Sequence, residues 1–428
     1  MISQNRRLTM KDNQAKYPQL RFKGFTDPWE ERKFKDNIVS IQTGTNLLGS
    51  AVNEGTPLIK MGNLQRGYFS FKKLEYLDSN SNVGSEDIVN YGDFLFNTRN
   101  TLELVGKGAT WTGISGKYAF NSNIARFKFD GIDTIFFNYL YNTQQVISQV
   151  HARAVGTTSV SAVYPRDLNS LLYYLPSIEE QQKIGSFFKQ LDDTITLHQR
   201  KLAMLKELKQ GYLQKLFPQN GSKFPQLRFA GFADAWEQRK LGELGLNISD
   251  GDWIEKQHIF ENGQYRIIQT GNIGVDEYLD KPQNAKYFRQ EDFNQLKANE
   301  IFPGDIVVCR LADPAGRAVI LPNIGKQMVT SVDVAILRPS SKISFRFLVS
   351  QLNNPRNLKQ VQIMASGSTR TRISRKNLER EIIQLPNINE QKKIGSFFSI
   401  LNSTIALHQR KLEKLQELKK GYLQKMFC

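Results

Sequence analysis

Two stretches of the chain carry apolar side chains at alternating steps of four and three residues, starting at Ile184 and at Ile394. A sustained spacing of this kind predicts a long α-helix that packs on another helix. Both stretches open with a helix-capping pattern, in which Ser or Asn is followed three residues later by Glu. We therefore predict helices over Ser177–Phe217 and Asn387–Phe427, rods of about 50 Å at ~1.5 Å per residue.

The chain also repeats itself. Pro176–Phe217 and Pro386–Phe427 are identical at 29 of 42 positions, and Pro18–Lys33 matches Pro225–Lys240 at 12 of 16. Between the short and the long blocks lie two regions of nearly equal length that share little sequence. Each ends in a small-residue loop and an apolar run typical of a strand, LLYYLP or EIIQLP. This order predicts two copies of one fold whose surfaces have diverged.

The two helices are expected to pack antiparallel, because the link from Phe217 to Pro225 is too short for a parallel crossover. The variable regions would then sit at opposite ends, related by a pseudo-twofold axis. His198 and His408 fall on the helix seam, either as a metal pair or pH switch, or as buried histidines hydrogen-bonded across the helices. We favour the second interpretation because no carboxylate cluster accompanies them.

Lys209 and Lys419 occupy the same seam, and we expect their ammonium groups to extend to solvent.

Charge narrows the class of partner. The 428 residues include 58 Lys and Arg against 41 Asp and Glu, a net charge of +17, while 40% hydrophobic residues suffice for real cores. This balance predicts a polyanionic partner, nucleic acid first and an acidic membrane surface second. The sequence has only two cysteines, which is typical of a reducing cytoplasm, and its first residues form no apolar leader. Because it also has no apolar run of about 18 residues, we predict a cytoplasmic protein without a membrane span.

No catalytic motif is apparent in the sequence. It has no phosphate-binding loop, no CxxC pair, no deaminase signature and no metal-ligand spacing. We therefore predict a chain with no catalytic residue, no metal and no cofactor of its own. A nucleic-acid enzyme with an unfamiliar site, and a scaffold that only joins proteins, remain the alternatives.

The densest basic cluster follows a loop of small residues near the end of the second variable region. Such a mixture of hydroxyls, backbone amides and guanidinium groups suits contacts to phosphates and base edges. The matching loop of the first region has fewer charges, so the two would read different bases. The candidate DNA-binding residues are Ser368, Thr369, Arg370, Arg372, Arg375 and Lys376 in the second region and Thr157, Thr158, Ser159 and Arg166 in the first. The alternative interpretation is that each loop is solvated and only caps the element that follows it.

Three further arginines are weaker candidates for DNA contact: Arg99, Arg310 and Arg317. A structural ion pair is about as plausible for each of them.

The motifs P-x-x-x-E-Q-x-K-I-G-S-F-F, L-H-Q-R-K-L and G-Y-L-Q-K, with the doubled PQLRF-x-GF-x-x-x-W, resemble the specificity (S) subunit of type I restriction–modification systems. The resemblance covers nearly the whole chain after about residue 17. It implies two mixed α/β target recognition domains that each read half of a split DNA target, with the helices as a ruler between them. It also implies a non-catalytic chain in the cytoplasm of a bacterium or archaeon.

The resemblance further implies partners and their cofactors. Two modification (M) subunits would bring S-adenosylmethionine and methylate adenine, and restriction (R) subunits would cleave DNA using ATP and Mg. The implied division of the chain is an extension over 1–17, recognition domains over 18–175 and 218–385, and conserved helices over 176–217 and 386–428. Half-sites about one DNA turn apart (~34–36 Å) suit such a ruler.

Overall fold

The computed structural model describes residues 17–427 except 158, 220, 339 and 366–370. The chain divides into two compact units, residues 1–198 with 412–428, and residues 199–411. Among the helices in the described part of the chain, none combines the length and the apolar character of a membrane span.

The two predicted helices are α3 (Ile178–Lys215) and α8 (Ile388–Met426). Their caps also form as predicted on one side, since the Ser177 hydroxyl accepts a hydrogen bond from the Glu180 amide at 3.4 Å. Asn387 does the same for the Glu390 amide at 3.0 Å. Each cap satisfies one of the amides that a helix start leaves without a partner in the helix.

The carboxylates of those two glutamates do not close a capping box. Glu180 instead receives two hydrogen bonds of 2.7 Å from the guanidinium of Arg21. Arg228 binds Glu390 in the same way, at 2.8 and 2.7 Å. Both carboxylates are fully buried. The bidentate hydrogen bonds from an arginine offset the free-energy cost of burying each charge. These pairs explain why the short and long blocks of the sequence repeat together.

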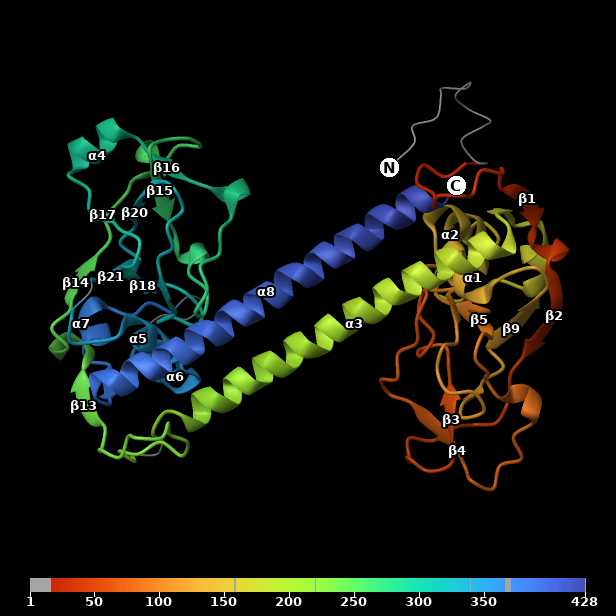
Figure 1. The fold of residues 1–428 in the computed structure, drawn as a ribbon, viewed down its shortest axis with the longest axis horizontal. Helices are drawn as coiled ribbons and strands as arrows, with labels where there is room; N and C mark the ends of the chain where they lie inside the picture. Colours follow the sequence, from red (N-terminus) through yellow and green to blue (C-terminus); the bar gives the residue numbers. More distant parts are fainter. Residues whose placement is uncertain (1–16, 158, 220, 339, 366–370, 428) are drawn as a thin grey trace. The chain divides into compact units, whose positions relative to one another are not determined.

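Within each unit, the start of one long helix lies against the end of the other (Figure 1). In the first unit the rings of Phe187 and Tyr422 lie 5.2 Å apart. In the second unit Tyr212 and Phe397 lie 4.9 Å apart. The helices therefore run antiparallel, as the short link after α3 predicted.

Lys209 and Lys419 correct one detail of that prediction. The Nζ atom of Lys209 lies 2.7 Å from the carboxylate of Asp276, and that of Lys419 lies 2.5 Å from Asp192. The expectation that these ammonium groups extend to solvent is wrong, because each is paired with a carboxylate. The spacing of residues along the helices could not show that these carboxylates lie close by.

The first unit is a three-layer arrangement of helices and two sheets. One sheet has the order β2-β9-β5-β7, a second β4-β3-β8, and short pairs complete the unit. Besides the start of α3 and the end of α8, its helices are α1 (Thr134–Tyr141) and α2 (Gln144–His151). Its strands are β1 (Glu30–Lys33), β2 (Ile38–Thr43), β3 (Thr56–Ile59), β4 (Glu75–Leu77), β5 (Phe94–Asn97), β6 (Arg99–Asn100), β7 (Gly108–Thr110), β8 (Ala119–Phe120), β9 (Ile124–Phe129), β10 (Val155–Gly156), β11 (Ser161–Ala162) and β12 (Leu172–Leu175).

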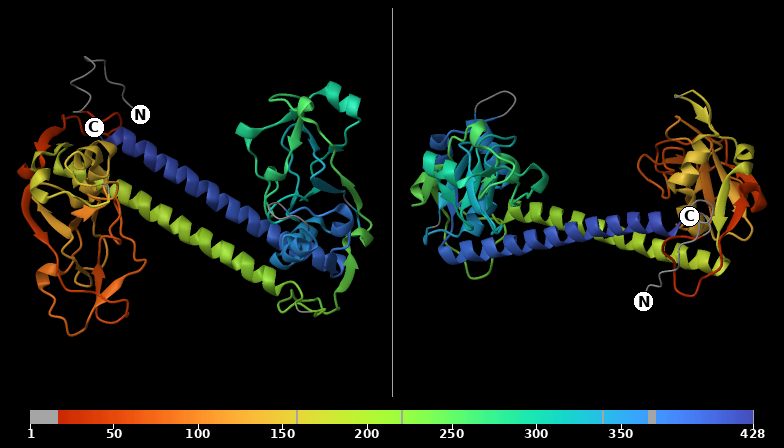
Figure 2. Two further views of the ribbon diagram at one scale, coloured as in Figure 1. Left: turned by 180° about the vertical axis from the view of Figure 1, so that it is seen from behind. Right: turned by 90° about the horizontal axis from the view of Figure 1, so that it is seen from above.

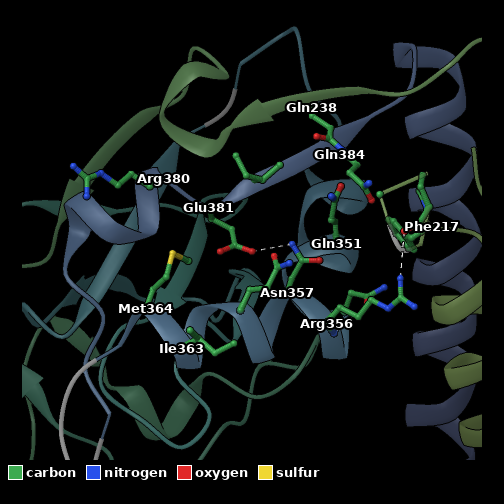
Figure 3. A pocket seen from close by; sticks show the side chains of 15 residues that line it. Phe217, Gln238, Gln351, Arg356, Asn357, Ile363, Met364, Arg380, Glu381 and Gln384 are labelled. Carbon is green, nitrogen blue, oxygen red and sulfur yellow. Dashed lines mark hydrogen bonds between the residues drawn. The ribbon is translucent and has the colours of Figure 1, made fainter. Parts of the chain in front are cut away.

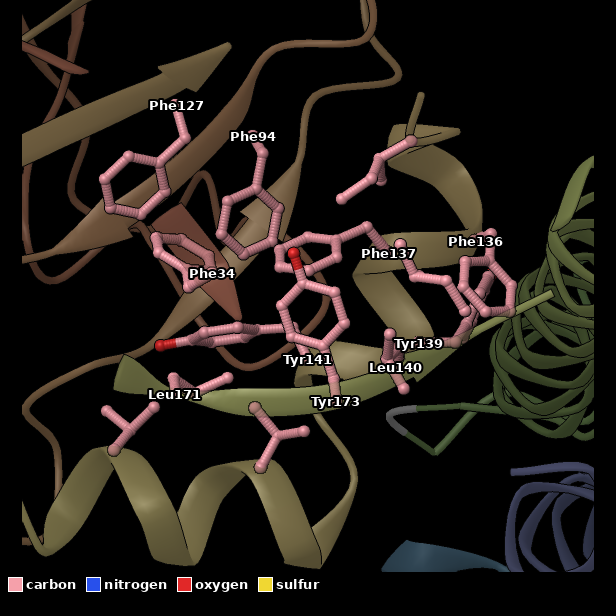
Figure 4. Packing of buried hydrophobic residues seen from close by; sticks show 14 of the residues in the cluster. Phe34, Phe94, Phe127, Phe136, Phe137, Tyr139, Leu140, Tyr141, Leu171 and Tyr173 are labelled. Carbon is pink, nitrogen blue, oxygen red and sulfur yellow. The ribbon is translucent and has the colours of Figure 1, made fainter. Parts of the chain in front are cut away.

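The central strand β5 is buried on both faces of the larger sheet, so its sequence is a continuous apolar run rather than an alternating one. On β5, Phe94 and Phe96 face the helices, whereas Leu95 faces the second sheet. Figure 4 shows the helix side, where Phe94 and Phe127 lie across from Phe137 and Tyr141. The rings of Phe94 and Phe137 meet edge to face at 4.9 Å, a favourable geometry for aromatic pairs.

The second unit repeats this plan with different side chains. Its four-stranded sheets have the orders β14-β21-β18-β19 and β16-β15-β20-β17. Besides the end of α3 and the start of α8, its helices are α4 (Gln290–Leu296), α5 (Phe345–Leu352), α6 (Pro355–Met364) and α7 (Arg375–Glu379). Its strands are β13 (Glu237–Lys240), β14 (Asn247–Asp250), β15 (Tyr265–Ile268), β16 (Tyr287–Phe288), β17 (Glu300–Ile301), β18 (Ile306–Cys309), β19 (Ala318–Ile320), β20 (Gln327–Thr330), β21 (Val334–Arg338) and β22 (Ile382–Leu385).

The repeated K-I-G-S-F-F motif marks a close crossing of helices in each unit. A Cβ atom on Gly185 of α3 would lie 2.8 Å from the Phe136 amide nitrogen of α1. A Cβ atom on Gly395 of α8 would lie 2.6 Å from the Phe347 amide nitrogen of α5. Figure 2 shows the long helices α3 and α8, which carry these glycines, from two further directions. Only glycine allows the backbones to approach this closely.

Candidate nucleic-acid interface

A small sheet in the first unit carries the first set of predicted DNA-binding residues. Its strand order is β10-β11-β6, and Ala162 of β11 pairs with Arg99 of β6. Gly156 begins the β10–β11 turn with φ of +129°, and a Cβ there would lie 2.4 Å from the Val160 carbonyl oxygen. The turn therefore needs glycine at this position.

The turn presents hydroxyl groups outward. Thr157 and Ser159 are both exposed, and their hydroxyl oxygens lie 3.1 Å apart. The exposed Arg99 side chain belongs to the same sheet, so the structure brings these three residues into one small sheet and its turn. Thr158 lies outside the described residues.

Arg166 lies just beyond this sheet, in the 3₁₀ turn Pro165–Ser170. Its side chain is 81% exposed, 3.8 Å from the Asp167 carboxylate. The guanidinium rests 5.3 Å from the centre of the Tyr164 ring, a cation–π arrangement that leaves its hydrogen-bond donors available.

A group of basic side chains next to this sheet, half-buried Arg66 and His151 and buried Lys107, was not predicted from the sequence. The Arg66 Nη2 atom lies 2.9 Å from Nε2 of His151 and donates to the Glu103 carbonyl at 3.2 Å. Lys107 donates from Nζ to the Gln65 side chain at 2.9 Å. Glu103 follows β6 closely in the chain, and His151 ends α2 shortly before β10.

Burial shapes the electrostatics of this group. Loss of solvent lowers the pKa of Arg66, of Lys107 and of His151, and the charge of Arg66 lowers the pKa of the other two further. The negative charge of Glu103 raises the pKa of Arg66 and Lys107, but it offsets their lowering only in part. A site with excess positive charge and little water favours an anion. The sequence signals were Gly106-Lys107-Gly108 and the lone His151.

The second unit pairs the corresponding segments differently. Leu311 and Arg372 form an isolated antiparallel β-bridge, and the Ala312 amide donates to the Thr371 carbonyl at 3.3 Å. This is the counterpart of the β6–β11 pairing. Ser368, Thr369 and Arg370 lie outside the described residues.

Most of the basic residues of this second segment are ion-paired. Arg310 is 7% exposed and binds the Asp250 carboxylate, with its Nε donating to the Ile373 carbonyl at 3.1 Å. This geometry favours the structural ion pair that the sequence left open for Arg310. Arg372 lies 3.0 Å from the Asp333 carboxylate and remains 43% exposed.

Three more predicted cations lie around this segment. Arg375 lies 3.5 Å from Asp250 and 3.4 Å from Glu379, and half of its side chain is exposed. Lys376 is exposed on the same helix. Arg317 is half-buried, 4.0 Å from the Cys309 sulfur. The donors of these arginines that face Asp333, Asp250 and Glu379 are occupied by carboxylates.

The two units therefore offer different chemistry on one framework. The first has an exposed arginine, hydroxyls and a half-buried cationic group. The second has arginines held by aspartates. Among the described residues, no group of three or more His, Cys, Asp or Glu side chains is placed to hold a metal ion.

This doubled α/β framework with two long helices defines a class of protein, and comparison with known proteins identifies the family. A family model, "Type I restriction modification DNA specificity domain", matches residues 26–207 and again residues 233–417. The chain therefore belongs to the type I restriction–modification DNA specificity family. The part of this family in such a system is recognition of the DNA target, and the methylase and nuclease activities reside in other subunits.

Individual relatives agree with this assignment over most of their length. The chain is 23% identical to a protein with the provisional name type I restriction enzyme MjaX specificity subunit, from Methanocaldococcus jannaschii, over 92% of this chain and 91% of that protein. It is 21% identical to the MjaVIII specificity subunit of the same organism, over 85% and 86%. The crystal structure of a type I S subunit from M. genitalium shares the fold, with a TM-score of 0.62 at 14% identity, over 96% of this chain and 99% of that one.

Proposed function

We propose that this chain reads an asymmetric, two-part DNA sequence through recognition domains at residues 18–175 and 218–385. The observation that carries this proposal is the repetition of one framework with two unlike candidate surfaces. Identical surfaces would suit a palindromic target, whereas unlike surfaces suit two different half-sites. The long helices then set the distance between the half-sites.

In the first domain, the exposed Arg99 and the hydroxyls of Thr157 and Ser159 are proposed to contact bases. Arginine pairs with guanine through two hydrogen bonds, and hydroxyl groups accept or donate to several base edges. The neighbouring Arg66 and Lys107 are proposed to hold a backbone phosphate, because their positive charge is partly shielded from solvent. His151 contacts Arg66 and adds little charge, since burial lowers its pKa. Phosphate contacts position the protein, while base contacts specify the sequence.

In the second domain, Arg372 and Arg375 are proposed to release Asp333 and Asp250 when they meet DNA. Each ion pair is partly exposed and therefore weak in water, so exchange for a phosphate or base costs little. Arg310 is proposed to hold the segment in place from its buried pair with Asp250.

The chain is proposed to work as part of a cytoplasmic complex. Two modification subunits would supply S-adenosylmethionine and methylate adenine, and restriction subunits would supply ATP- and Mg-dependent cleavage. Apolar side chains on the helices of the second unit, Met204 on α3 and Ile400 and Leu407 on α8, are more than 60% exposed. Exposed apolar side chains of this kind suit a protein partner.

The test substitutes one arginine in each domain. Arg99→Ala is expected to weaken recognition at one half-site by about 1–3 kcal/mol per base pair and to relax the preference there, while the other half-site is unchanged. Arg372→Ala should affect the opposite half-site. The measurement is binding of the chain with its modification subunits to DNA libraries randomised in one half-site at a time.

Lys23→Ala, an exposed cation in the short repeat, is the matched control and should leave both preferences intact. Loss of preference at both half-sites from either single substitution would contradict the proposal of two independent domains.

A further inference from the structure

A pocket of about 510 Å³ opens in the second unit between α6 and β22. Figure 3 shows Glu381 and Asn357 directed toward each other within it. The Asn357 Nδ2 atom donates to Oε1 of Glu381 at 3.1 Å. Side-chain amides of Gln351 and Gln384 line the pocket together with Phe217.

Glu381 is a buried acid with an incomplete set of partners. Its side chain is 1% exposed, and Oε2 has no hydrogen-bond partner among the described residues. Burial raises the pKa of this carboxyl to about 7, and its bond from Asn357 offsets this only in part. A buried carboxyl in this condition costs stability unless something completes its bonds.

The two arginines that line the pocket do not complete those bonds. Arg356 donates to the Gln219 side chain at 2.6 Å and to the Pro218 carbonyl at 3.5 Å. Arg380 is exposed, and in Figure 3 its guanidinium extends away from Glu381. No ion pair to Glu381 forms within the described part of the chain.

The first unit shows that the fold does not need this carboxyl. Leu175 of β12 and Leu385 of β22 hold the same register against β1 and β13, so Leu171 is the counterpart of Glu381. The carbonyl of Leu171 accepts from the Phe34 amide at 2.9 Å, and that of Glu381 accepts from the Leu241 amide at 2.8 Å.

Asn357 likewise has an apolar counterpart. It is the third residue after the Asn354 cap of α6, and Val146 is the third residue after the Thr143 cap of α2. Val146 and Leu171 are buried in the apolar core of the first unit. The second unit has therefore replaced two core side chains with a polar pair that faces a pocket.

We propose that this pocket binds a guanidinium group, with Glu381 as its counter-ion. A guanidinium donates in its own plane to a carboxylate through two hydrogen bonds, and can give a remaining donor to a side-chain amide oxygen such as that of Gln384. Phe217 supplies an aromatic surface at one side of the pocket. The group belongs either to a free small molecule or to an arginine side chain of a partner protein. This site is separate from the proposed DNA-reading residues and does not depend on them.

The test titrates the full-length protein with N-acetyl-L-arginine amide by calorimetry or NMR. N-acetyl-L-citrulline amide, which is nearly isosteric but neutral, is the control ligand. Saturable binding of the arginine derivative, at least tenfold tighter than the citrulline derivative, is expected. Binding should be about tenfold tighter at pH 8 than at pH 6, because the carboxyl is mostly charged only above its pKa of about 7.

Variants separate the pocket from the rest of the surface. Glu381→Leu, which installs the side chain found in the first unit, should fold and should bind at least tenfold more weakly. Lys359→Gln removes an exposed charge of α6 outside the pocket and should bind as the unaltered protein does. No saturable binding at pH 8 by the folded protein, or equal binding by Glu381→Leu, would overturn the proposal.

Adding the modification subunits distinguishes the two sources of the group. If the assembled complex still binds the arginine derivative, a free small molecule is the ligand. If assembly excludes the derivative, an arginine of the partner occupies the pocket. Because DNA binding is not measured, failure here leaves the proposed DNA-reading function untouched.

Discussion

Buried carboxylates are treated in two ways in this chain. Glu180 and Glu390 each receive two hydrogen bonds from an arginine of the short repeat, whereas Glu381 has one amide bond and no cation. Removing Arg21 or Arg228 would leave a charge buried without a partner, which typically costs about 3–5 kcal/mol. Glu381 already carries a cost of this kind.

The stability of the second unit should therefore depend on the protonation of Glu381. Its pKa is about 7 when folded against 4.5 as the ordinary value, so the folded state holds a proton that the unfolded chain releases between these values. Stability contributed by this group is present below pH 4.5 and falls by up to about 3 kcal/mol as the pH rises to 7. Glu381→Leu should remove the fall.

The measurement is hydrogen exchange of the α6 and β22 amides at pH 5 and pH 8, corrected for intrinsic exchange rates. The advantage of Glu381→Leu over the unaltered protein should be larger at pH 8. An equal difference at the two pH values would show that the carboxyl does not titrate in this range.

A substitution at Lys107 tests whether this side chain contacts a DNA phosphate or a base edge. Lys107→Gln is expected to weaken DNA binding about equally for all sequences, because a phosphate contact carries no sequence information. The slope of log affinity against log salt should become shallower by about one. Fluorescence anisotropy across a salt series measures this, with Lys23→Gln as the control. A changed base preference would instead place Lys107 at a base edge.

The sequence could not distinguish Arg99 from Arg310 at this scale. They lie one position apart in the repeat, since Arg99 corresponds to Leu311 and Arg310 to Thr98, and one is exposed whereas the other is buried against Asp250. The aspartate is 60 residues away along the chain, and only the sheet brings it close. The environment of the Lys209 ammonium group was predicted wrongly for the same reason, since its partner Asp276 is distant in the sequence.

At the scale of elements, the long helices were predictable because their period continues over many turns. Their caps, their direction and the strands β12 and β22 also followed from the sequence. The small sheet β10-β11-β6 did not, since strands of two residues are too short to show a period. The continuous apolar runs of β5 and β18 likewise give no alternation, because these central strands are buried on both faces.

Two glycines of α3 should respond oppositely to the same substitution. Gly185→Ala places a methyl group 2.8 Å from the Phe136 amide nitrogen, so α1 and α3 must move apart and the first unit should lose stability. Gly211→Ala meets nothing within 4 Å and should stabilise its helix by up to about 1 kcal/mol. Hydrogen exchange in each unit measures both effects. A tolerated alanine at position 185 would contradict the close crossing.

At the scale of the whole molecule, the helices are proposed to act as a ruler. Inserting seven residues after His198 in α3 and seven after His408 in α8 keeps their pairing period and adds about 10 Å. The gap between half-sites should lengthen by about three base pairs, since each base pair adds ~3.4 Å. Both half-site sequences should be retained. An unchanged gap would exclude the helices as the determinant of spacing.

The central claim is that this chain supplies the DNA sequence specificity of its complex. The most direct test maps N6-methyladenine across the genome of a host without its own system, which expresses the cognate modification subunit with or without this chain. The account predicts a split, asymmetric methylated motif that appears only when the chain is present. No new motif, with both proteins expressed and associated, would contradict it.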